Sequence, residues 1–179
     1  MKIRIAILSA ILLATFVSQV AAQAKKHDEI AREAIENAAY GSRAYLKRDY
    51  KAAISLYSKA IELERQERTL PRDIWRVVVD NLGMSYAFTG DLKNAKIVFE
   101  YGIENDKTYP MFYYNLACTY AEMNDLDGAL KNLDLTFKFR KNLIKGETLP
   151  VPENDDSFKW FLKDEKFIAG MKEIRARNK

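Results

Sequence analysis

The sequence predicts an all-α protein, a solenoid of three helix pairs followed by C-terminal capping helices. Its 179 residues include only seven Gly and four Pro, which disfavours turn-rich β architectures. Three segments repeat one another at spacings of 42 and then 34 residues. A period of 34 residues is typical of helix–turn–helix units that stack on their neighbours. The elements are taken below in chain order.

The first 24 residues have the layout of a cleavable signal peptide. Lys2 and Arg4 form a short basic head, and residues 5–17 form an uncharged, mostly apolar run of 13 residues. This run is short for a membrane span, which needs about 20 residues. Cleavage after Ala22 or Ala24 fits the small residues there, and an uncleaved N-terminal anchor is the alternative. We therefore expect a periplasmic or secreted protein with no integral membrane span after cleavage. No Cys stands near the cleavage point to carry a lipid anchor.

Small residues recur in each repeat where its two helices are expected to cross. On the first helices they are Gly41, Gly83 and Ala117. On the second helices they are Ala53, Ala95 and Ala129. Larger side chains at these positions would hold the paired helices apart. Large residues follow at Tyr57, Phe99 and Leu133, and we expect them to reach across to the neighbouring pair.

Each pair also contains a turn signal between its two helices. Asp49, Asp91 and Asp125 can accept hydrogen bonds from free N–H groups at a helix start. The residues just before them are Arg48, Gly90 and Asn124. A left-handed backbone is useful at that turn, and it suits Gly and Asn better than Arg.

These residues together resemble the tetratricopeptide repeat. The resemblance is strongest in NLGMSYAFTGDLKNAK from Asn81 and NLACTYAEMNDLDGAL from Asn115, and it covers roughly residues 34–143. It implies a right-handed solenoid whose helix pairs occupy about 27–66, 73–106 and 109–144, within residues 25–145. The family's closing Pro is missing from all three copies. Eight extra residues after the first copy predict a longer helix or loop before the second pair.

Residues 155–179 are expected to form a C-terminal helical cap. Pro150 and Pro152 end the third pair, and Asp155 or Asp156 can start a short helix that carries Phe158. A second helix follows, with apolar residues at helical spacing: Phe167, Met171 and Ile174. This pattern is similar to the closing unit of bacterial tetratricopeptide repeat proteins.

The resemblance implies a function in binding. Tetratricopeptide solenoids usually bind an extended peptide or a partner helix in a groove lined by the first helices. In this chain the groove positions would be Tyr45, Asp80, Asn81, Met84, Phe88, Met111, Tyr114, Asn115 and Glu122. Such a groove is aromatic, contains Met and is slightly acidic. We expect a non-enzymatic interaction module or adaptor of the bacterial envelope that binds a protein or peptide.

Three other interpretations use the same side chains. They can pack against the chain's own C-terminal helix or line a tightly closed solenoid. They can form a homo-oligomer by burying this face against a second copy. They can bind a glycan by stacking sugar rings on Tyr45, Phe88 and Tyr114, which requires exposed rings with polar neighbours.

Composition argues against catalysis, metal binding and nucleic-acid binding. The chain has one His, His27, and one Cys, Cys118, which leaves no triad, no Cys-based zinc site and no set of metal ligands. No Gly-rich phosphate loop is present, so we expect no cofactor and no enzyme activity. Removal of the two basic residues of the leader lowers the net charge from +4 to +2. That balance gives no reason to expect a nucleic-acid partner.

Basic residues cluster between the first two repeats. Arg65, Arg68, Arg72 and Arg76 recur every three or four residues, so a continuous helix would place them on one face. They could meet anionic lipid headgroups or an acidic partner. A solvated face balanced by Glu62, Glu64 and Glu67 is the simpler interpretation.

Overall fold

The structure, a computed structural model, describes residues 2–178, and side chains from residue 15 onward. Its described part contains α-helices and short 3-10 turns and no strand. The α-helices are α1 (Lys2–Leu46), α2 (Tyr50–Gln66), α3 (Arg72–Phe88), α4 (Leu92–Asn105), α5 (Pro110–Glu122), α6 (Leu126–Phe139) and α7 (Glu165–Arg177). The 3-10 turns are η1 (Arg140–Asn142), η2 (Pro152–Asn154) and η3 (Asp156–Phe158).

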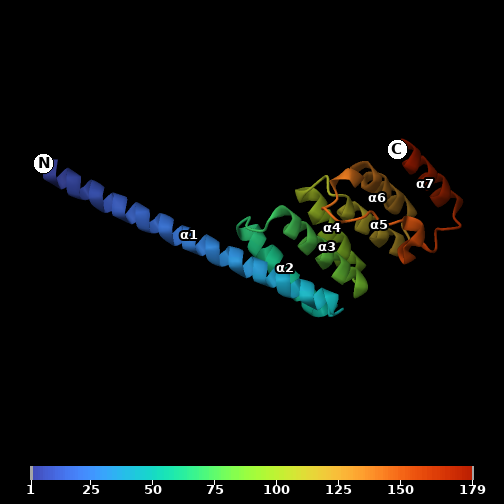
Figure 1. The fold of residues 1–179 in the computed structure, drawn as a ribbon, viewed down its shortest axis with the longest axis horizontal. Helices are drawn as coiled ribbons and strands as arrows, with labels where there is room; N and C mark the ends of the chain where they lie inside the picture. Colours follow the sequence, from blue (N-terminus) through green and yellow to red (C-terminus); the bar gives the residue numbers. More distant parts are fainter. Residues whose placement is uncertain (1, 179) are drawn as a thin grey trace.

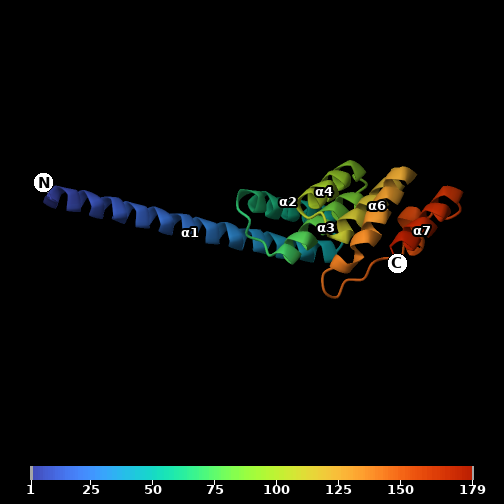
Figure 2. The same cartoon turned by 90° about the horizontal axis from the view of Figure 1, so that it is seen from above.

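The helices stack as consecutive antiparallel pairs. The C-terminal part of α1 packs on α2, α3 packs on α4, and α5 packs on α6 (Figure 1). The first helices also touch in series, α1 with α3 and α3 with α5, so they form one layer. The last helix, α7, packs against α6 at the far end of the stack (Figure 2). This arrangement confirms the predicted all-α solenoid.

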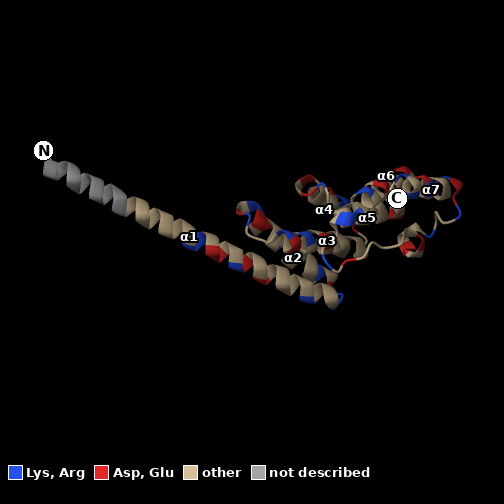
Figure 3. Ribbon diagram, turned by 45° about the horizontal axis from the view of Figure 1, so that its top comes forward, with Lys and Arg blue, Asp and Glu red and all other residues tan. Residues whose placement is uncertain are grey.

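Helix α1 continues well beyond the first pair as a single extended helix (Figure 1). His27 on this extension contacts Glu67 in the loop after α2. Residues 15–24 carry no charge and appear as a tan stretch in Figure 3. The predicted signal peptide, residues 1–24, lies mostly outside the residues whose side chains are described. Between residues 15 and 178, no helix is long and apolar enough to cross a membrane.

The turn inside each pair has the predicted chemistry. Asp49, Asp91 and Asp125 accept hydrogen bonds from the backbone N–H groups three residues ahead, at 2.8–3.1 Å. Before them, Arg48, Gly90 and Asn124 have φ values of 60°, 80° and 59°. The left-handed conformation costs a non-glycine residue about 1 kcal/mol, so Arg48 is mildly strained.

The small residues permit close helix contact, as predicted. A Cβ atom added to Gly41 would lie 2.7 Å from the Tyr57 ring, and one added to Gly83 would overlap the Phe99 ring. The large rings therefore cover the glycine of their own pair. Tyr57 also reaches the neighbouring pair, since its hydroxyl accepts a hydrogen bond from Asn81 at 3.0 Å. Phe99 likewise lies in one core cluster with Leu116 of α5.

The eight extra residues lengthen both helices around the first junction. Helix α2 has 17 residues where α4 and α6 have 14, and α3 has 17 where α5 has 13. The two helices stay separate, because α2 ends at Gln66 and Pro71 precedes α3. The four arginines of this region therefore do not share one helix.

The C-terminal segment returns to the stack after α6. Asp155 starts η3 by accepting a hydrogen bond from the Ser157 N–H at 3.0 Å, and η3 contacts α5. Helix α7 buries Phe167, Met171 and Ile174, the three apolar residues predicted at helical spacing. The same segment therefore packs against both helices of the third pair.

Candidate functional site

The nine predicted groove residues all come from the layer of first helices. Tyr45 lies on α1, four residues lie on α3, and four lie on α5. We call this surface the first-helix face, defined by Tyr45, Asp80, Asn81, Met84, Phe88, Met111, Tyr114, Asn115 and Glu122. Their exposure varies: Phe88 and Glu122 are exposed, Tyr114 and Asn115 are buried, and the others are partly buried.

An aromatic cluster marks the end of the face formed by the first two pairs. The Phe88 side chain is 53% exposed, and its ring stacks on Tyr50 with centroids 4.7 Å apart. Tyr45 lies 6.4 Å from Phe88 and 5.8 Å from Tyr50. Tyr50, at the start of α2, was not among the predicted site residues. Three rings from three helices thus form an apolar platform that is open to solvent at Phe88.

Asn81 belongs to an internal hydrogen-bond chain. Its side-chain amide donates to the Tyr57 hydroxyl, which in turn donates to the Ser42 hydroxyl at 3.0 Å. Ser42 donates to the carbonyl of Ala38 at 3.0 Å. This amide therefore links the second pair to the first.

Asp80 lies next to Asn115 and carries a strongly shifted carboxyl group. Burial raises its pKa from 3.8 to about 7, although a hydrogen bond from Asn115 at 2.6 Å acts in the opposite direction. The negative charge of Glu147 raises the pKa further. Asp80 therefore changes charge near neutral pH, at the boundary between the second and third pairs.

The two methionines of the face fill packing positions. Met84 packs against the small core cluster of Ala95, Phe99 and Leu116. Met111 packs against both of the larger core clusters. Both side chains remain partly exposed, so each joins the core to the surface of the face.

On the third pair, the chain covers its own first helix. Tyr114 is only 2% exposed, and its hydroxyl donates to Asp155 at 2.8 Å. Its ring meets Phe158 edge-on at 6.3 Å between centroids. Further along α5, Glu122 accepts a hydrogen bond from the Ser157 hydroxyl at 3.0 Å. Residues 155–158 thus occupy this part of the first-helix face.

The covered region also holds the single cysteine. The Cys118 thiol lies 3.7 Å from an Asp155 oxygen. Burial raises the pKa of this thiol well above its usual value, and the nearby Asp155 charge adds to the shift. Because the thiolate is the reactive form, Cys118 is a poor nucleophile in this environment.

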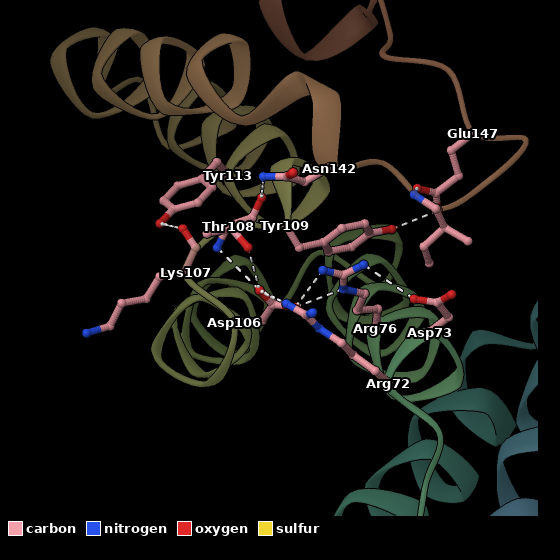
Figure 4. Close-up of polar contacts among 11 residues, drawn as sticks. Arg72, Asp73, Arg76, Asp106, Lys107, Thr108, Tyr109, Tyr113, Asn142 and Glu147 are labelled. Carbon is pink, nitrogen blue, oxygen red and sulfur yellow. Dashed lines mark hydrogen bonds and ion pairs between the residues drawn. The ribbon is translucent and has the colours of Figure 1, made fainter.

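An ion-pair network joins the start of α3 to the loop between α4 and α5 (Figure 4). Arg72 and Arg76 both donate to Asp106, at 3.0 and 2.8 Å. Burial disfavours the charged form of Asp106, but the two arginines outweigh it and lower its pKa to about 2. Arg76 also lies over the Tyr109 ring, 4.6 Å from its centroid. This network fixes the start of α3 against the end of α4.

The loop after α6 is anchored to the same junction (Figure 4). Tyr109 donates to Glu147 at 2.7 Å, and Asn142 donates to the Thr108 carbonyl at 3.2 Å. Glu147 also accepts from the Ile144 N–H at 2.8 Å. These contacts hold the loop close to α3 and α5, on its way to residues 155–158.

The described residues contain no group of three or more His, Cys, Asp or Glu side chains arranged to hold a metal ion. The first-helix face presents aromatic rings at one end and a carboxylate near its middle.

Comparison with known families identifies the repeats. A family model described as a tetratricopeptide repeat matches residues 79–109, and a second model with the same description matches residues 98–131. The chain contains tetratricopeptide repeats. Together the two matches extend from α3 to α6. Among curated proteins, none matches the chain by sequence.

The chain has two structural features that its repeat pattern did not reveal. One is the coverage of α5 by residues 155–158, and the other is the network of Arg72, Arg76 and Asp106. Both join residues 30 or more positions apart. The only local signal was the spacing of the arginines, which did not indicate their partner.

Proposed function

We propose that this tetratricopeptide repeat protein is a non-enzymatic interaction module that binds a peptide or helix on its first-helix face. Residues 25–145 would form the module and residues 155–179 its cap. Repeats of this family generally mediate protein–protein interactions, and their fold is typically non-catalytic. The leader-like residues 1–24 favour a role in the bacterial envelope.

The observation that carries this proposal is the exposed aromatic platform of Phe88, Tyr50 and Tyr45. Rings of this size bury much apolar surface when a partner covers them, and such anchors dominate many interfaces. Val77 and Phe88 are exposed and Met84 is partly exposed, at helical spacing along α3, so apolar side chains recur on this face on both sides of Asp80 and Asn81. An amphipathic helix or an extended apolar peptide has the matching surface.

The glycan alternative has less support from the ring positions. It requires three accessible rings, and Tyr114 is buried under Phe158 and hydrogen-bonded to Asp155. A homo-oligomer would bury the same exposed rings against a second copy of the chain. The experiment below distinguishes it from a heterologous partner.

The test is photo-crosslinking in the native envelope, with a photo-reactive residue in place of Met84. A second chain carries the photo-reactive residue in place of Lys131, which is exposed on α6. We expect a discrete heterologous product from position 84 and none from position 131. Adding Phe88→Ala to the first chain should remove most of that product. The matched control Ile97→Ala, at an equally exposed site on α4, should leave it unchanged.

Three results would contradict the proposal. Crosslinks only between copies of the chain would assign the face to a homo-oligomer. Equal products from positions 84 and 131, or a product insensitive to Phe88→Ala, would show that the face has no selective partner.

A further inference from the structure

A second surface, away from the first-helix face, has the features of a binding pocket. It lies where α2 ends, α3 begins and α4 ends, and has a volume of about 470 Å³. Its main lining residues are Arg65, Arg68, Leu70, Arg72, Trp75 and Tyr101. Pockets that hold small ligands or side chains commonly measure about 300–1,000 Å³.

The pocket is built by the residues that depart from the 34-residue repeat. The lengthened end of α2 supplies Arg65, the loop supplies Arg68 and Leu70, and the lengthened start of α3 supplies Arg72 and Trp75. At the next junction, α4 and α5 lack these extra turns. The pocket is therefore a specific addition to the repeat scaffold.

The charges of the pocket leave two guanidinium groups without a carboxylate. Both acidic lining residues are already bonded: Glu64 accepts from the N–H groups of Thr69 and Leu70 at 2.8 Å, and Asp106 accepts from Arg72. Arg65 and Arg68 form no ion pair with any described residue. Arg65 lies over the Tyr101 ring, 4.5 Å from its centroid, which fixes one guanidinium at the mouth.

The floor of the pocket is aromatic and apolar. Trp75 is 8% exposed and meets Tyr101 edge-on, with centroids 6.1 Å apart. Leu70 completes this wall. A ligand that fits must therefore combine negative charge with an apolar group.

We propose that this pocket binds an acidic peptide segment. Carboxylate side chains of the peptide pair with Arg65 and Arg68, whose planar guanidinium groups match carboxylate geometry. An apolar side chain between the carboxylates packs on Leu70, Trp75 and Tyr101. A hollow with an apolar floor fits a peptide side chain, whereas a flat lipid surface would leave it unfilled. This site is independent of the proposed partner of the first-helix face.

The experiment uses Trp75 as its own reporter. The chain has two Trp residues, so Trp160→Phe, at a site that is 79% exposed, leaves only Trp75. The probe is the blocked peptide Gly-Asp-Glu-Leu-Glu-Asp-Gly, and its control replaces the acids with Asn and Gln. We expect saturable fluorescence changes with the acidic peptide, weakening as salt is added, and none with the neutral peptide.

Matched variants of the full-length chain then test the arginines. Arg65→Gln with Arg68→Gln should weaken peptide binding by about tenfold or more. Lys131→Gln with Lys141→Gln removes the same charge from exposed sites elsewhere and should change affinity by less than about twofold. Arg72 is left unchanged because it holds Asp106. If the double variant unfolds, Arg68→Gln alone serves, since Arg68 is exposed and forms no ion pair with the residues that the structure describes.

Four outcomes overturn the proposal. No saturation up to about 1 mM acidic peptide would mean that the pocket has no useful affinity for it. Equal binding of the neutral peptide, or full binding by the arginine variant, would exclude recognition through these charges. Binding of phosphatidylserine vesicles that depends on Arg65 and Arg68, without peptide binding, would assign the arginines to a membrane surface. The variant Phe88→Ala should bind the acidic peptide as well as the parent chain does. Failure of this pocket to bind can therefore be distinguished from failure of the function proposed for the first-helix face.

Discussion

The two ends of the first-helix face differ in what covers them. Around Phe88, three rings from α1, α2 and α3 meet, and one of them stays open to solvent. Around Tyr114, the ring and the hydroxyl are both engaged by residues of the chain's own C-terminal segment. Both regions include side chains from first helices of the repeats, so the repeat sets where a side chain lies but not what contacts it.

The covered end illustrates how a repeat surface can be satisfied internally. Asp155 accepts a hydrogen bond from Tyr114 of α5, and Ser157 donates one to Glu122 of the same helix. The Phe158 ring packs against the Tyr114 ring. These are the same kinds of contact that a bound peptide would make on the open end. The C-terminal segment therefore shows the kinds of polar and apolar contact that α5 makes with a segment packed on it.

The largest expected effect is at the covered end, from Phe158→Ala. Phe158 is fully buried against Tyr114 and Phe167, so removing its ring leaves a cavity between α5 and α7. We expect the free energy of unfolding to fall by about 3–5 kcal/mol. Urea denaturation followed by circular dichroism measures this. A loss below about 1 kcal/mol would mean that the segment does not rest on α5 in solution.

The next largest effect is expected from Asp80→Asn, near the middle of the first-helix face. This substitution should change the free energy of unfolding in a pH-dependent way. The folded state raises the Asp80 pKa from 3.8 to about 7, so folding favours the protonated form. This contribution to stability is present below about pH 4 and is lost as pH rises through 7. Asn keeps an acceptor for the Asn115 amide and carries no charge. We therefore expect the variant to be more stable than the parent by about 1–3 kcal/mol at pH 8.

The same comparison made near pH 4 is the control for Asp80. The gain should shrink to almost nothing there, because the parent side chain is then protonated in the folded state. Urea denaturation at several pH values gives the difference directly. A stability gain that does not vary with pH would show that Asp80 ionises normally in the fold.

The smallest effect on stability is expected at the open end, from Phe88→Ala. More than half of this side chain is already in solvent, so its removal should cost about 1 kcal/mol or less. Phe88→Ala and Phe158→Ala should be measured in the same urea series, so that their losses in free energy of unfolding can be compared directly. A loss as large as that of Phe158→Ala would mean that the platform is part of the core.

Local features of the fold were predictable because they depend on neighbouring residues. The aspartate caps, the left-handed turns at Gly90 and Asn124, and the small residues opposite Tyr57 and Phe99 each follow from the chemistry of one turn or one helix crossing. Their repetition made each signal stronger.

The contacts that decide access to the face were not predictable in this way. Tyr114 and Asp155 are 41 residues apart, and Arg76 and Asp106 are 30 apart. Helical periodicity predicts which side of a helix is apolar, but not which distant segment will cover it. Asp155 starts the predicted short helix, but its second role as a partner of α5 has no periodic signal.

The return of residues 155–158 across α5 also bears on how the array can grow. A new helix pair inserted after α6 would need the surface that these residues occupy, and it would have to detach Asp155 from Tyr114 before it could stack. Insertion between the first and second pairs leaves these residues in place and would instead interrupt the hydrogen bond from Asn81 to Tyr57. We therefore expect engineered changes in repeat number to keep the third pair and residues 155–158 together as one unit.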